Sequence, residues 1–113
     1  MSRDSRLLLE DIQTSCQKIL RYTDGVGYIG FMHDERTFDA VLRNLEVIGE
    51  AARNLPEDII SANPQVEWPR IVGFRNVIAH KYFGVEPEIV WDIVPDHIPR
   101  LLSRISEMLA AED

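Results

Sequence analysis

Apolar side chains recur every three or four positions over much of this chain, which is the spacing of amphipathic helices. Residues 4–23 show this pattern with charged residues in between, and a second such stretch follows Asp34, a good N-cap residue. The apolar positions of the two stretches are Leu8, Ile12, Cys16, Ile19 and Leu20, then Phe38, Val41, Leu42, Leu45, Ile48 and Ala52. The glycine-rich segment between them, residues 24–34, is predicted to be a loop.

Prolines open the next two helical segments. Pro56 begins a short segment over residues 56–63, and Pro69 begins a longer helix over residues 69–83. Both positions suit proline, because the first helical residue needs no amide hydrogen. The short segment is therefore predicted to connect two long helices.

The last helical region begins near Pro87 and is interrupted at Pro95. Asp96 then caps a renewed helix, although one kinked continuous helix fits the pattern equally well. No alternating strand pattern is found along the sequence. The pattern therefore predicts an all-α bundle of four main helices plus a short connecting helix, in a single domain over residues 1–113.

Composition and charge exclude several classes of protein. The chain has 113 residues, of which 45% are hydrophobic and 27% charged, as expected for one folded domain. A single cysteine, no uninterrupted apolar signal sequence and no stretch of about 20 apolar residues together predict a cytoplasmic protein without membrane spans. The net charge of -7 argues against a protein that coats nucleic acid, but Arg70, Arg75, His80 and Lys81 form one local basic cluster.

Neither a cofactor nor a metal is expected. Gly25, Gly27 and Gly30 have the GxGxxG spacing of dinucleotide-binding loops, but that motif requires a preceding strand, whereas a helix is predicted there. A flexible loop is the better interpretation. The three histidines, His33, His80 and His97, also lack the sequence spacing that zinc and di-iron sites require.

Four other residues have ordinary structural interpretations. Glu46 and Glu50 lie one turn apart, as an acid/base pair would, but neighbouring arginines favour an ion-paired helix surface. A role for these carboxylates at a dimer surface, or in positioning an active-site arginine, stays open. Trp68 and Trp91 are interpreted as core or interface anchors rather than as platforms for nucleobases.

The segment RNVIAHKY, from Arg75 to Tyr82, concentrates chemically active side chains on one predicted helix. Asn76 and His80 are four residues apart and share a face, so the amide can orient the imidazole. Arg75 and His80 are about 140° apart around an ideal helix, so one helix directs them poorly at a common phosphate. A two-fold dimer packed along this helix would place both copies of these side chains around one cleft. An ordinary charged helix face, capped by Tyr82, explains the same residues.

RNVIAHKY fits the pattern Arg-x4-His-x-Tyr, and the chain resembles the HepT-like toxins of the HEPN superfamily. The resemblance extends over RDSRLLLEDI, FDAVLRNLEVIGEAARNLP, WPRIVGFRNVIAHKYFGV and IVWDIVPDHIPRL. It implies an HEPN-like helical bundle, a homodimer, and a composite interface site for metal-independent RNA cleavage. It also implies a partner, an MntA-type minimal nucleotidyltransferase antitoxin that transfers AMP from ATP to the motif tyrosine, here Tyr82. The attached AMP would oppose RNA entry through its bulk and negative charge.

The resulting hypothesis is an endoribonuclease toxin that promotes attack of the RNA 2'-hydroxyl on the adjacent phosphorus. His80 acts as general base or acid, Arg75 binds the scissile phosphate, and Asn76 orients the imidazole or the phosphate. Arg70 and Lys81 are further candidates for RNA binding. Two alternatives are kept: a non-catalytic module that binds a nucleotide or docks the transferase, and a purely structural helical subunit.

Overall fold

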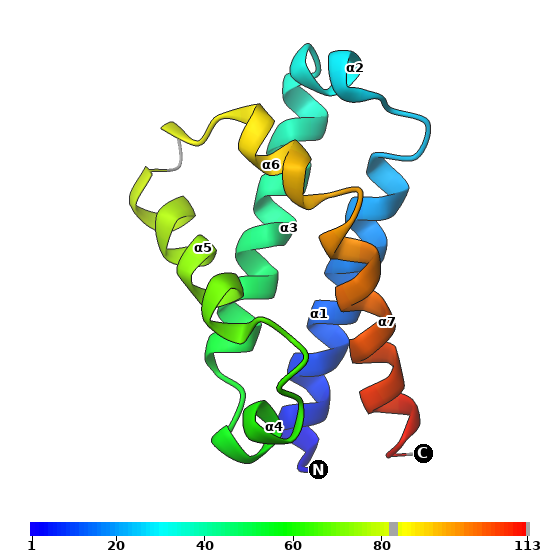
Figure 1. The fold of residues 1–113 in the computed structure, drawn as a ribbon, viewed down its shortest axis with the longest axis vertical. Helices are drawn as coiled ribbons and strands as arrows, with labels where there is room; N and C mark the ends of the chain where they lie inside the picture. The colour runs from blue at the N-terminus through cyan, green and yellow to red at the C-terminus, as the bar shows by residue number, and fades with distance from the viewer. Residues whose placement is uncertain (82–83, 113) are drawn as a thin grey trace.

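The computed structural model describes residues 1–81 and 84–112, and the regular structure within these ranges is helical. The long helices are α1 (Arg3–Tyr22), α3 (Glu35–Arg53), α5 (Trp68–Lys81) and α7 (His97–Ala110), and the short ones are α2 (Tyr28–Met32), α4 (Glu57–Ala62) and α6 (Pro87–Ile93). The predicted all-α fold with four main helices is confirmed (Figure 1). None of these helices combines the length and hydropathy needed to cross a membrane.

The four long helices pack in the order α7, α1, α3, α5. Helix α1 contacts both α7 and α3, and α3 also contacts α5. The buried face of α1 supplies Leu9, Ile12, Cys16 and Ile19, which are fully excluded from solvent. In the ranges described, α5 and α7 make few close backbone contacts, so the bundle is left open between its first and last members.

Cys16 belongs to this core and carries a free thiol. Burial raises the pKa of the Cys16 thiol to about 12, because the thiolate would lose its hydration among apolar side chains. A neutral, buried thiol is a poor nucleophile and a poor metal ligand. Cys16 is therefore a packing residue of α1.

Asp34 and Asp96 were both predicted to cap helices, and of the two only Asp34 does so through its side chain. Asp34 accepts hydrogen bonds from the Thr37 backbone N–H at 3.0 Å and from the Thr37 hydroxyl at 2.6 Å. These bonds lower the pKa of Asp34 because they stabilise its charged form. The bond from the Thr37 hydroxyl makes the largest contribution. Asp96 occupies the N-cap position of α7, but its side chain makes no capping hydrogen bond and pairs with Arg100 at 3.1 Å. The predicted capping role of Asp96 was wrong: its backbone is already helical, with φ -114° and ψ -49°.

The predicted loop over residues 24–34 was wrong in part, because α2 forms inside it. Phe31 on α2 is only 1% exposed, and its ring centroid lies 5.1 Å from that of Trp91 and 6.1 Å from that of Phe38. This aromatic packing stabilises a helical turn that the local glycines disfavour. Gly25, with φ +73°, makes the preceding turn in a conformation that suits glycine.

The interpretation of both tryptophans as anchors is confirmed. Trp68 is 4% exposed, and its indole N–H donates to the backbone oxygen of Asn63 at 3.0 Å. Trp91 packs on Phe31 and thereby holds α6 against α2. The interruption at Pro95 is also confirmed, because α6 and α7 are separate helices.

Candidate functional site

Helix α5 presents Asn76 and His80 of the motif on the face that points away from the bundle. Its inner side buries Ile78 and Trp68. The outer side exposes Pro69, Gly73, Asn76, Val77 and His80. Val77 is 48% exposed, although its side chain is apolar. Apolar residues on opposite sides of a helix indicate that other protein surfaces cover both of those sides.

Arg75 is the motif side chain with the most contacts to its surroundings. Its Nη2 lies 3.0 Å from Oε2 of Glu50 on α3, and its Nη1 donates to Oδ1 of Asn76 at 3.3 Å. The side chain of Arg75 is 25% exposed and that of Glu50 is 47% exposed. Glu50 is held in turn by Arg53, at 3.7 Å, and by the amide of Asn54, at 3.3 Å. The guanidinium is therefore fixed at the junction of α3 and α5.

Gly49 allows this junction to form. A Cβ placed on Gly49 would lie 2.8 Å from Cγ and 3.3 Å from Cα of Arg75, and closer still to its Cβ. Only glycine lets α3 approach α5 closely enough for Glu50 to reach the guanidinium. Gly49 was not among the residues predicted from the sequence to matter for the site. The available signal was a lone glycine inside an otherwise continuous helical pattern, which often has a packing reason.

The ion-paired interpretation of the Glu46 and Glu50 face is confirmed. Glu46 pairs with Arg43 at 2.6 Å, whereas Glu50 pairs with Arg53 and Arg75. The two carboxylates thus engage different arginines. The sequence left open whether one of these carboxylates positions an arginine of the motif. Glu50 does contact Arg75.

His80 is exposed on α5, and within residues 1–81 and 84–112 it makes no hydrogen bond or ion pair. The oxygen of Asn76 is engaged by Arg75. The expected pairing of Asn76 with the imidazole is therefore replaced by a pairing with the guanidinium. The chain supplies a fixed cation, an amide and an exposed imidazole, which are groups suited to binding a phosphate and moving protons.

Of the remaining basic and phenolic candidates, Arg70 has a described side chain, and it does not lie beside Arg75. Arg70 lies on another side of α5 and pairs with Glu67 at 2.8 Å. The side chain of Lys81, and Tyr82 entirely, lie outside the described residues. The roles of Arg70 and Lys81 in RNA binding remain predictions.

The histidines occupy three separate environments. His33 Nδ1 lies 2.9 Å from the backbone oxygen of Ile29, and His97 Nδ1 lies 3.2 Å from Arg100 Nη2. His80 is on the outer face of α5. Across the part of the chain that the structure describes, no three His, Cys, Asp or Glu side chains are grouped so that they could hold a metal ion.

Comparison with known proteins places these residues in a family context. Residues 12–108 match the family model "Ribonuclease HepT-like". "Putative RNase MJ0127" of Methanocaldococcus jannaschii is 41% identical over 95% of this chain and 88% of its own length. "Probable ribonuclease HepT" of Thermococcus cleftensis is 33% identical over 96% of this chain and 98% of its own. No solved structure matches the chain. By both its family match and these relatives, the chain belongs to the HepT-like ribonuclease family.

Proposed function

We propose that this protein is a metal-independent endoribonuclease toxin that acts as a homodimer. Membership of the HepT-like ribonuclease family supports RNA as the substrate. The observation that carries the site assignment is the position of Arg75, Asn76 and His80 on α5, with the guanidinium anchored and the imidazole exposed. Packing two copies along the outer face of α5 would place all six side chains around one cleft, because a two-fold axis duplicates each residue.

In this proposal the 2'-hydroxyl of RNA attacks the adjacent phosphorus while the bond from phosphorus to the 5'-oxygen breaks. One His80 takes the proton of the 2'-hydroxyl, and the second copy donates a proton to the departing 5'-oxygen. Arg75 stabilises the negative charge that grows on the phosphate oxygens. The products are a 2',3'-cyclic phosphate and a 5'-hydroxyl. Water has no role as the nucleophile in this step.

Arg75 retains the capacity to bind a phosphate while it is paired with Glu50. A guanidinium has five N–H donors, whereas Arg75 donates one hydrogen bond to Asn76 and makes one ion pair with Glu50. Its Nε–H also has no acceptor among the described residues, but it is buried, so a phosphate would be bound through the two Nη groups. The carboxylate therefore orients the cation without saturating it. We assign Glu50 as a positioning residue for Arg75.

Total RNA incubated with the purified protein in EDTA tests the activity. We expect cleavage by the parent chain, and a loss of about 10²- to 10³-fold in the Arg75→Ala variant, because a donor to the developing oxyanion is removed. Arg43→Ala is the matched control: it removes an exposed arginine paired with Glu46 on α3, and cleavage should persist. Tight nucleotide binding by the parent chain without any cleavage would instead support the non-catalytic module.

The dimer is tested at Val77. Replacing Val77 with aspartate puts a charge in the centre of the proposed interface, so we expect monomers by light scattering and a loss of cleavage. Leu7→Asp on α1 is the control, because Leu7 is as exposed as Val77, at 49% against 48%. It should remain dimeric and active. A Val77→Asp variant that cleaves RNA as a monomer contradicts the composite site.

We further propose that AMP transfer to Tyr82 by an MntA-type nucleotidyltransferase inhibits the enzyme. The added phosphate and adenosine would bring negative charge and bulk to the end of the motif, opposing RNA entry. With the transferase and ATP, the parent chain should gain the mass of an AMP group, and Tyr82→Phe should not. Tyr28→Phe, which changes a tyrosine of α2 that is 49% exposed, should be modified like the parent. Equal modification of Tyr82→Phe would show that the acceptor is a different residue.

A further inference from the structure

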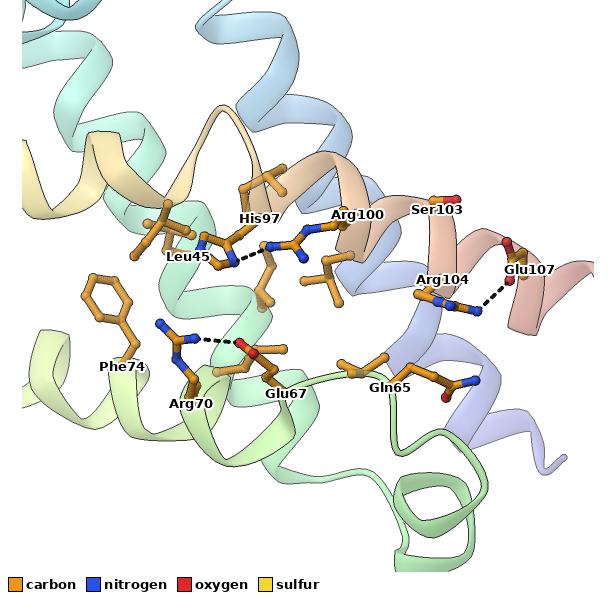
Figure 2. A pocket seen from close by; sticks show the side chains of 16 residues that line it. Leu45, Gln65, Glu67, Arg70, Phe74, His97, Arg100, Ser103, Arg104 and Glu107 are labelled. Atoms are coloured by element: carbon orange, nitrogen blue, oxygen red, sulfur yellow. Dashed lines mark hydrogen bonds and ion pairs between the residues drawn. The ribbon is translucent and has the colours of Figure 1, made fainter.

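A groove between α5 and α7 has no part in the proposed cleavage reaction. It has a volume of about 550 Å³ and exists because these two helices do not pack directly on each other. Leu45 and Ile48 of α3 form its floor, Ile71 and Phe74 line the α5 side, and Leu101 lines the α7 side. Figure 2 shows these walls facing each other across the gap. The groove therefore combines an apolar interior with polar and charged side chains along its borders.

Three arginines stand at the rim of this groove, from both walls (Figure 2). Arg70, Arg100 and Arg104 have side chains that are 71%, 66% and 46% exposed. Each is paired on its own helix or at its start, the partners being Glu67 at 2.8 Å, Asp96 at 3.1 Å and Glu107 at 3.4 Å. Glu67 and Glu107 also line the groove, so its lining carries three arginines and two glutamates. Exposed pairs of this kind are weak, so carboxylates of an incoming molecule can replace them.

The groove is separate from the proposed catalytic face. Arg70 and Arg75 are five residues apart on α5, which places them about 140° apart around the helix. Arg75 turns toward Glu50 of α3, whereas Arg70 borders the groove. A molecule bound between α5 and α7 would therefore leave Arg75, Asn76 and His80 uncovered.

We propose that this groove binds an amphipathic helix of a partner protein, with apolar residues on one face and carboxylates beside them. The lining residues of α7 run from His97 to Glu107, a rise of about 15 Å, which matches about three turns of a bound helix. A helix in this position contacts α5 and α7 together and closes the open side of the bundle. The three rim arginines select an acidic helix over a basic one.

Two labelled synthetic peptides of about 14 residues, a length of roughly four helical turns, test the proposal by fluorescence anisotropy with the full chain. Both carry leucines at helical spacing, and they differ only in glutamates or lysines beside the apolar face. We expect the glutamate peptide to bind about tenfold more tightly than the lysine peptide. Reversing the rim charge in an Arg100→Glu, Arg104→Glu double variant should invert this preference. Arg36→Glu, Arg43→Glu, which changes two exposed arginines of α3, should not invert it.

Three outcomes would overturn the proposal: binding of neither peptide, equal binding of both, or a preference that the double variant leaves unchanged. If the double variant instead lowers the oligomeric state of the protein in sedimentation, the groove is covered by a second copy of this chain. RNA cleavage by the double variant is measured in parallel and should match the parent. Failure of the groove proposal can therefore be distinguished from failure of the nuclease assignment.

Discussion

Replacing His80 with alanine should reduce RNA cleavage by about 10²- to 10⁴-fold, the usual contribution of general acid and base catalysis. In the proposed homodimer both copies of the imidazole are lost, so neither proton transfer has a donor or acceptor of suitable strength. His80 is exposed and makes no hydrogen bond with the described residues. Its truncation should therefore change the free energy of unfolding by no more than about 0.5 kcal/mol.

His33→Ala is the matched control for this experiment. His33 is also exposed, but its ring contacts the backbone of Ile29 on α2, remote from α5 in the chain. Cleavage should be measured for both variants with the same RNA in EDTA, beside urea unfolding and light scattering. Full activity of a folded, dimeric His80→Ala variant would reject the assignment of His80 as the proton-transfer group.

Helices α1, α3 and α7 were predictable because each buries one face, and a buried face leaves a periodic pattern in the sequence. Ile12, Cys16 and Ile19 repeat at helical spacing, and all three are fully buried. Helix α2 was not predictable in this way. It is stabilised by the contact of Phe31 with Trp91, two residues that are distant in sequence, and local glycine content predicts the opposite.

The chemical groups of the candidate site were also recognisable from sequence, because a cation, an amide and an imidazole are concentrated in RNVIAHKY. Which of these side chains lie close together in the fold was less predictable from the sequence. Arg70 is close to Arg75 in sequence, yet the two side chains diverge around α5 and pair with Glu67 and Glu50. The pair of Arg70 with Glu67 is local, whereas only tertiary contact between α3 and α5 brings Glu50 to Arg75. The role of Gly49 depends on that same contact and leaves only a weak local signal.

The contact at Gly49 can be tested by adding a single methyl group. In Gly49→Ala the new Cβ meets Cα, Cβ and Cγ of Arg75, atoms that move only if the two helices separate. Overpacking of this kind costs about 1–3 kcal/mol, and the higher helix propensity of alanine offsets about 1 kcal/mol of it. We expect a net loss of up to about 2 kcal/mol in the free energy of unfolding, together with slower RNA cleavage because the guanidinium is displaced.

Gly30→Ala is the matched control, because a Cβ on Gly30 meets only Val26 Cγ1, at an ordinary 3.7 Å. It should be neutral or stabilising by up to about 1 kcal/mol, since alanine is the better helix former. Urea unfolding of both variants is compared at one protein concentration, because the stability of a dimer depends on concentration. If Gly49→Ala were as stable and as active as Gly30→Ala, α3 and α5 would not be in close contact, and Glu50 would not be positioned to orient Arg75.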